Sequence, residues 1–216
     1  MEHASSIQAL LASLAEGLGL PLSDTARERL ARYAELVIHW NRTANLTGAR
    51  SVATFCRRFV ADALAVSPLI EGSCLADLGS GNGLPGLVLA ILAPERSVTL
   101  VEPRARRARF LQQARIELAL PLVEVANCRV EDWTPRELPD AIVSQAVGDL
   151  AFLLEATCGR RTASARLYAL KGQYPTVELA ALGPAAAACE VQRVEVPGWD
   201  ERHLVIIDCA RLPSPG

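Results

Sequence analysis

The sequence has no apolar run long enough to cross a membrane. Its longest apolar stretches, such as LVLAILA at residues 87–93, are far shorter than the ~20 residues that a helix needs to span a bilayer. The N-terminus also lacks the basic segment of a secretory signal and carries acidic residues instead. We therefore expect a cytoplasmic protein without a membrane partner.

The sequence also lacks the residue patterns of metal sites. Its six cysteines form no C-x-x-C pair, and there are only three histidines. Structural zinc motifs are built from closely spaced pairs of these residues, so the spacing argues against them. We expect reduced thiols and no bound metal.

The sequence has little lysine: a single lysine stands against 21 arginines. The formal net charge of −2 does not indicate a protein that binds nucleic acid. Two explanations of the arginine excess remain open. One is the composition bias of the genome, and the other is a surface of guanidinium groups that bind phosphates.

The length of 216 residues suits one domain with a small appendage. Residues 1–66 read as a helical extension, with Leu30, Tyr33 and Trp40 in a stripe at helical spacing. Thr25 and Glu28 have the spacing of a capping box at the start of this helix. We expect Trp40 to pack against the protein.

Residues 67–212 have the pattern of one compact α/β unit. Short β-rich apolar runs alternate with helical stretches, which predicts a mostly parallel sheet covered on both faces. The last two runs have no helix between them and predict a closing antiparallel hairpin. The expected strands lie at residues 73–79, 97–102, 122–127, 140–145, 165–172, 189–198 and 202–208.

A glycine-rich loop, ADLGSGNGLPG, follows the first expected strand and opens a helix. Ligands of such sheets bind where the strands end, so the loop is a candidate site. Gly81, Gly83 and Gly86 satisfy the G-x-G-x-x-G fingerprint of dinucleotide-binding proteins. Asp77 with Gly79, Gly81 and Gly83 matches instead the acid-x-G-x-G-x-G loop of methyltransferases that use S-adenosylmethionine (AdoMet).

The aspartate favours AdoMet. This ligand presents an ammonium and a sulfonium, which an anionic strand end attracts, whereas the pyrophosphate of a dinucleotide would be repelled. Glycines allow the backbone to approach the ligand closely. Glu102 ends the second strand and could bind ribose hydroxyls of either ligand. Glu131, after the third strand, would border the adenine, or else it is an exposed helix cap.

Several motifs together resemble one family. The GNGLPG loop, ALKGQ at residues 169–173 and ERHLVI at 201–206 are similar to the RsmG family, also called glucose-inhibited division protein B. These are bacterial methyltransferases that modify N7 of a guanine in 16S ribosomal RNA. The resemblance spans about residues 30–208. It implies a Rossmann-like class I AdoMet-dependent methyltransferase, with 16S ribosomal RNA or the small ribosomal subunit as its partner.

The resemblance also implies the cofactor-binding positions, and these include departures from the family pattern. Gln145 stands where the family has an arginine, and Phe59 and Ala63 replace a histidine and a serine, while Asp62 is kept. The implied cofactor-binding residues are Gly79, Leu84, Glu102, Val130, Glu131 and Gln145.

Contacts with RNA would come from basic residues. Arg104 and Arg107 share one face of a helix in PRARRARF, although they could also form a merely solvated face. Lys171 is the only lysine, and Arg202 and His203 lie in ERHLVI. For His203 a structural role is equally open.

The expected chemistry needs little from the protein. Guanine N7 already carries a lone pair, so methylation requires positioning and desolvation rather than a general base. The sequence has neither the Asn/Asp-Pro-Pro-aromatic motif of amino-directed methyltransferases nor a Pro-Cys nucleophile. We therefore assign no catalytic residue. We also expect a monomer.

Three alternative functions remain open. They are a methyltransferase of a small molecule or protein, a non-catalytic AdoMet-binding module and a dinucleotide oxidoreductase.

Overall fold

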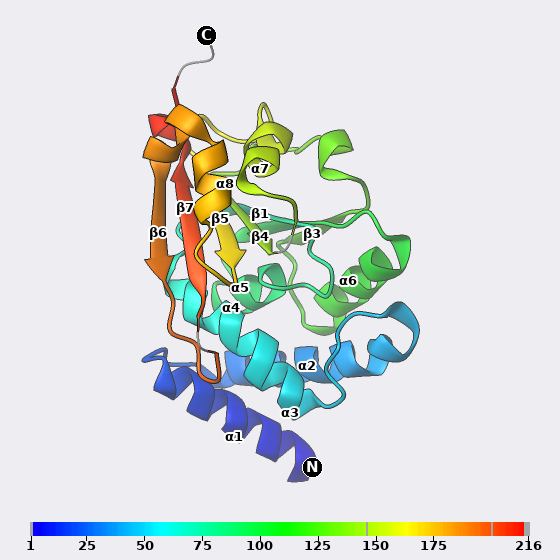
Figure 1. Cartoon of the computed structure of the whole chain (residues 1–216). Helices are drawn as coiled ribbons and strands as arrows, with labels where there is room; N and C mark the ends of the chain where they lie inside the picture. Colours follow the sequence, from blue (N-terminus) through cyan, green and yellow to red (C-terminus); the bar gives the residue numbers. More distant parts are fainter. Residues whose placement is uncertain (1, 146, 200, 214–216) are drawn as a thin grey trace.

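The computed structural model describes residues 2–145, 147–199 and 201–213. Within these residues the chain forms a seven-stranded sheet with helices packed around it (Figure 1). The strands are β1 Cys74–Leu78, β2 Ser97–Val101, β3 Val123–Ala126, β4 Ala141–Gln145, β5 Arg166–Lys171, β6 Cys189–Arg193 and β7 His203–Asp208. The α-helices are α1 Glu2–Gly17, α2 Asp24–Ala44, α3 Val52–Phe55, α4 Ala61–Val66, α5 Gly86–Leu92, α6 Ala105–Glu117, α7 Leu150–Thr157 and α8 Thr176–Ala181.

The strand order is β3-β2-β1-β4-β5-β7-β6. Strands β1 to β5 pair in parallel, whereas β7 is antiparallel to both β5 and β6. All seven runs that the sequence marked as strands are strands, and the closing hairpin is confirmed. The crossover direction changes beside β1, which leaves a crevice at the carboxyl ends of β1, β2 and β4.

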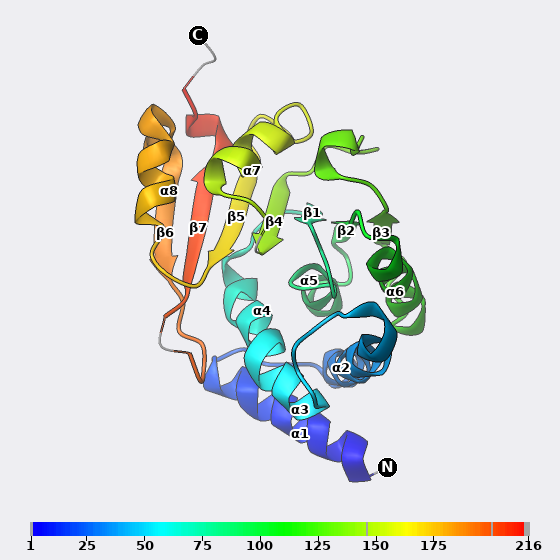
Figure 2. The ribbon, with the colours of Figure 1, turned by 45° about the vertical axis from the view of Figure 1, so that its right-hand side comes forward.

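Both faces of the sheet are buried. Along β1, Leu75 belongs to a core cluster with α1 to α6, whereas Ala76 and Leu78 belong to a second cluster with α7. Figure 2 shows α1 to α4 gathered at one end of the molecule and α7 and α8 at the other. The two-sided burial explains why the strand sequences are continuously apolar.

The N-terminal helices pack as the sequence predicted, with one correction at a helix start. Helix α2 begins after Ser23, whose side-chain oxygen accepts a hydrogen bond from the Ala26 N–H at 3.1 Å. The Thr25–Glu28 capping box is therefore wrong, because the extended residue that can cap the helix is Ser23. Trp40 packs edge-on against Phe110 at 6.0 Å between ring centroids.

The last helical segment before the sheet is interrupted. Helices α3 and α4 are joined by a π-helical turn, Cys56–Val60, and the 3-10 turn Ser67–Leu69 follows α4. Further 3-10 turns lie at Val130–Asp132, Gly183–Ala188 and Cys209–Arg211. The larger core cluster joins the helices before residue 67 to the sheet. The division of the chain into residues 1–66 and 67–212 stays a prediction.

Among the described residues, no helix combines the length and the apolar character that crossing a bilayer requires. All six cysteines are free thiols.

Gly86 is a point where the fold tolerates no side chain. A Cβ there would lie 2.5 Å from Leu100 Cδ2 and 2.6 Å from Asp77 Oδ2. We predict that Gly86→Ala lowers the free energy of unfolding by about 1–3 kcal/mol, as overpacking does. Thermal melting should show this as a drop of about 2–4 °C per kcal/mol for a chain of this length.

Gly17 provides the matched control, because a Cβ there would meet nothing within 4 Å. Gly17→Ala should melt at the wild-type temperature or slightly above it, since alanine favours a helix. Equal melting temperatures for Gly86→Ala and the wild type would contradict the proposed close packing.

Candidate active site

Two cavities meet at the carboxyl ends of the parallel strands. The larger one, which we call the loop cavity, has a volume of about 790 Å³, within the ~300–1,000 Å³ range of small-molecule sites. The smaller one, the adjoining cavity, has a volume of about 300 Å³. Gln145, the last residue of β4, lines both.

The glycine loop forms one wall of the loop cavity. Gly79 has a φ of +65°, and the N–H groups of Gly79 and Ser80 both donate to the Val101 carbonyl, at 2.8 and 3.1 Å. A Cβ on Gly79 would lie 2.2 Å from Val147 Cγ2, so only glycine fits. Gly81 also has a positive φ, +56°, but a Cβ there would meet nothing closer than 3.6 Å. The space beside Gly81 is therefore open, whereas the space beside Gly79 is filled by Val147.

Glu102 holds this loop from the end of β2. Its Oε2 accepts a hydrogen bond from the Gly81 N–H at 2.9 Å, and its Oε1 accepts one from the Arg104 N–H at 2.8 Å. The residue is buried, yet it lines the loop cavity. Because a carboxylate oxygen can accept more than one hydrogen bond, Glu102 retains capacity for a ligand.

Asp77 lies beneath the loop. Its Oδ2 accepts a hydrogen bond from the Gly86 N–H at 3.0 Å, while Oδ1 has no hydrogen-bond partner among the described residues. Burial raises the pKa of Asp77 well above its usual range, against the hydrogen bond from Gly86 that lowers it. Asp77 does not line the loop cavity, so its expected attraction of a cationic ligand stays a prediction.

Gly83 does not line the cavity either. A Cβ on Gly83 would lie 2.4 Å from Leu87 Cδ1, so this glycine allows α5 to pack closely against its own entry loop. The other predicted cofactor-binding residues are brought together. The loop cavity is lined by Gly79, Gly81, Leu84, Glu102, Val130, Glu131 and Gln145.

Sequence reasoning missed several side chains of this wall. Phe59 from the π-helical turn and Phe152 from α7 add aromatic surface to the loop cavity, and Asn82 adds an amide. Phe59 was noted only as a departure from a family pattern. No local pattern could place it here, because its position depends on how α3 and α4 pack against the sheet.

The N-terminal helices support the loop directly. The Tyr33 hydroxyl of α2 donates to the Asn82 carbonyl at 2.9 Å, and the Asn82 side chain donates to the Leu46 carbonyl at 3.3 Å. Tyr33 is fully buried, and burial raises the pKa of its hydroxyl well above the usual range. The hydroxyl therefore remains a donor at physiological pH.

The predicted RNA-contacting residues fall into two groups. Arg104 and Arg107 line the loop cavity, and Arg107 donates to the Asn45 carbonyl at 3.2 Å. Lys171, Arg202 and His203 line the adjoining cavity instead.

The basic residues of the adjoining cavity have partners within the protein. Lys171 forms an ion pair with Glu178 at 2.7 Å. Arg202 lies 3.4 Å from Asp62 Oδ2, and its guanidinium is 3.6 Å from the centre of the Trp199 ring. Its partners orient the Arg202 guanidinium at the cavity wall.

Two cavities that share the lining residue Gln145 can hold a group donor beside an acceptor, which is the arrangement that a group transfer requires. Within the described part of the chain, no cluster of three histidine, cysteine, aspartate or glutamate residues could hold a metal ion.

Comparison with known proteins gives consistent matches. The model of a family described as GidB, rRNA small subunit methyltransferase G, matches residues 26–205. A "Ribosomal RNA small subunit methyltransferase G" of Hydrogenovibrio crunogenus is 40% identical over 201 residues, 93% of each chain. The protein of the same name from Laribacter hongkongensis is 42% identical over 197 residues, 91% of this chain and 95% of the relative.

Solved structures support the fold. A SAM-dependent O-methyltransferase from Thermotoga maritima superposes with a TM-score of 0.55 at 16% identity, covering 70% of this chain and 66% of that one. The fold is thus the Rossmann-like class I methyltransferase fold that the sequence predicted, and a dinucleotide oxidoreductase is no longer an alternative. The chain is an AdoMet-dependent methyltransferase and belongs to the rRNA small subunit methyltransferase G family.

Proposed function

We propose that this chain transfers the methyl group of AdoMet to N7 of a guanine in 16S ribosomal RNA, either in the free RNA or in the small ribosomal subunit. The observation that carries the proposal is the junction at Gln145. There a cavity walled by the glycine loop and Glu102 shares a lining residue with a second cavity walled by Lys171 and Arg202. The relatives named for ribosomal RNA methylation support the substrate class.

The loop cavity fits AdoMet. The open space beside Gly81 is a cradle that a side chain would fill, and Glu102 has acceptor capacity left for ribose hydroxyls. Leu84 and Val130 offer apolar contacts, and Glu131 borders them. We assign cofactor binding to these residues and to Gly79 and Gln145, and we assign Asp77 and Gly83 the support of the loop.

AdoMet, when bound, supplies an electrophilic methyl group on a sulfonium. The residues of this chain then need to hold the acceptor nitrogen in line and keep water away. The apolar side chains of Val66, Leu170, Val194 and Val196 wall the adjoining cavity and would exclude water around a base. Because guanine N7 has a lone pair, no side chain has to remove a proton.

The RNA strand would follow the basic residues near the two cavities. Arg104 and Arg107 lie beside the loop cavity, and Lys171, Arg202 and His203 lie beside the adjoining cavity. Guanidinium groups bind phosphates in a bidentate manner, which suits arginine for this role. We further propose that the protein acts in the cytoplasm and as a monomer.

The test is direct methylation. Purified protein is incubated with labelled AdoMet and with unmethylated 16S ribosomal RNA or small subunits, and N7-methylguanine is mapped by chemical cleavage. We expect incorporation at one guanine. Incorporation into neither substrate would reject the RNA proposal and favour a small molecule or protein as methyl acceptor.

We predict that Gly81→Val abolishes AdoMet binding while the protein stays folded. The valine would occupy the open space beside the loop, and the positive φ of this residue adds strain of about 1–3 kcal/mol. Calorimetry measures the affinity, and circular dichroism checks the fold. Near-native affinity in a folded variant would remove Gly81 from the site.

We predict that Glu102→Ala weakens AdoMet binding by about 1–3 kcal/mol, because charge-assisted hydrogen bonds to the ribose are lost. The KM for AdoMet should rise more than kcat falls. Glu102→Gln keeps one acceptor oxygen and should lose less. Glu124→Ala, an exposed carboxylate on β3, serves as the control and should bind AdoMet normally. Unchanged affinity in Glu102→Ala would contradict the ribose assignment.

We predict that the double variant Arg104→Ala/Arg107→Ala binds RNA more weakly and with a shallower dependence on salt. Each phosphate contact releases condensed counterions when RNA binds. A variant that lacks two such contacts releases fewer of them, so the magnitude of the slope of log K against log salt should decrease by about 1–2. Both arginines line the loop cavity, so AdoMet is kept saturating.

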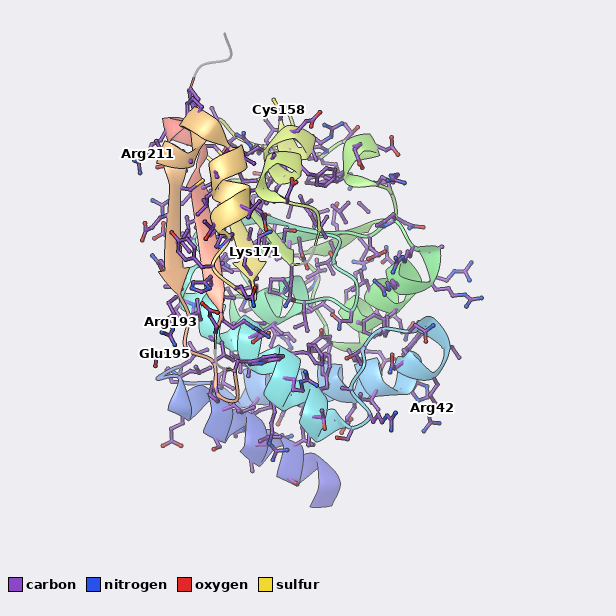
Figure 3. The ribbon with its side chains drawn as sticks, viewed as in Figure 1. Arg42, Cys158, Lys171, Arg193, Glu195 and Arg211 are labelled. Atoms are coloured by element: carbon purple, nitrogen blue, oxygen red, sulfur yellow. The ribbon has the colours of Figure 1, made fainter. Side chains whose placement is uncertain are left out.

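Arg211→Ala is the matched control for this experiment. Arg211 follows the end of β7 opposite to the end that pairs with Lys171, and Figure 3 shows the two residues well apart. The control should keep the wild-type slope. If the double variant also keeps it, the RNA does not cross this surface.

A further inference from the structure

Asp62 is a buried carboxylate whose hydrogen bonds are incomplete. The residue is 4% exposed and lies at the start of α4. Its Oδ1 is buried with no hydrogen-bond partner among the described residues, and Oδ2 has a single long contact, 3.4 Å from Arg202 Nε. A buried carboxylate normally accepts two or more hydrogen bonds, so this side chain has unused acceptor capacity.

Such a residue costs the folded protein stability. Burial raises the pKa of Asp62, and the charges of Arg202 and Arg58 lower it in opposition. An asparagine or an apolar residue at this position would remove the desolvation cost. A buried polar group that is retained without partners calls for an explanation, and an absent ligand is one that can be tested.

The position of Asp62 identifies the ligand that could reach it. Asp62 lines the adjoining cavity, together with Gln145, Arg202 and apolar side chains. The π-helical turn Cys56–Val60 immediately precedes α4 and also carries Phe59, which lines the loop cavity. Such turns are frequent at functional sites. One short segment thus presents one side chain to each cavity.

We propose that Asp62 recognises the Watson–Crick edge of the target guanine, so that it selects guanine over adenine for methylation. This inference rests on the proposed function, which brings a guanine into the adjoining cavity with N7 toward the cofactor. The N1–H and the exocyclic amine lie on the edge of the purine opposite N7. In that orientation they face the cavity wall away from the cofactor, and Asp62 is the one carboxylate among the described residues that line this cavity.

The chemistry of a carboxylate distinguishes the two purines. Guanine presents two adjacent donors, N1–H and the N2 amine, to the two oxygens of an ionised carboxylate. Adenine presents a lone pair at N1 in the same position, which the carboxylate repels. The apolar side chains Val66, Leu170, Val194 and Val196 contribute surface for the faces of a base but do not distinguish one purine from another.

The present arrangement allows this contact with a small movement. Oδ1 is enclosed, so the carboxylate has to turn about its terminal bond for both oxygens to meet the base. Such terminal torsions are broad, and the single contact from Arg202 is long. Arg202 stacks on Trp199, and its positive charge favours the ionised form of Asp62.

Binding of nucleotides tests the inference without the ribosome. Wild type and Asp62→Asn are titrated with GMP, IMP and AMP at saturating S-adenosylhomocysteine, and chemical shifts of the protein report binding. We expect the wild type to prefer GMP to AMP by at least 10-fold, with IMP between them because it lacks the N2 amine. Asp62→Asn should lose most of this preference, since the amide replaces one of the two acceptor oxygens with a donor NH2 group.

Methylation and stability provide the second measurement. On small subunits, kcat/KM of Asp62→Asn should fall about 10- to 100-fold, as when charged hydrogen bonds are lost. AdoMet affinity should stay within about two-fold, and the melting temperature should be equal or higher because a buried charge is removed. Glu195→Gln changes an exposed carboxylate in the β6–β7 connection (Figure 3) and should match the wild type.

The outcomes separate the two proposals. Wild-type preference for GMP without any methylation of ribosomal RNA would reject the RNA substrate and keep the role of Asp62. Equal affinities of the wild type for GMP and AMP, or an unchanged preference in Asp62→Asn, would overturn the role of Asp62. A fall in activity that is accompanied by a lower melting temperature and weaker AdoMet binding would also overturn it, by showing that Asp62 acts only in folding.

Discussion

The hydrogen bond from the Gly86 N–H to the buried carboxylate of Asp77 fixes the geometry on which the site depends. It fastens the first turn of α5 to the end of β1, so the intervening glycines have to arch toward the cavity. A hydrogen bond within a protein contributes about 0.5–1.5 kcal/mol net, and losing the partner of a buried polar group costs more. Glu102 holds the opposite side of the arch through Gly81, and two acidic side chains thus enclose the loop from below and from the side.

The helices before the sheet complete this support. Tyr33 and Leu46 bind the backbone and side chain of Asn82, and the carbonyl of Asn45 accepts a hydrogen bond from Arg107 of α6. The same core cluster extends from α1 to β7. The site is therefore a joint product of the helical segment and the sheet.

The strands and most of the predicted residues that line the loop cavity could be identified from the sequence, because both depend on local patterns. Continuous apolar runs identified the strands, and the loop and Glu102 lie at strand ends whose meeting follows from a parallel sheet. The sequence could not show that Asp77 points beneath the loop, since that depends on the close packing of Gly86. Phe59 reaches the site through long-range helix packing, and Asp62 was noted only as a kept motif residue. The choice between Ser23 and Thr25 as helix cap depended on backbone conformation.

The shared position of Gln145 has a thermodynamic consequence. Because its side chain lines both cavities, the orientation that suits one occupant alters the environment of the other. With both cavities occupied as proposed, we expect the binding free energies of the two ligands not to be additive, and by reciprocity each ligand would change the affinity of the other by the same factor. Loss of the methyl group from the cofactor would be felt across this amide, so release of the two products is coupled as well. A neutral side chain transmits this coupling through its hydrogen bonds and shape, whereas an arginine would add its charge.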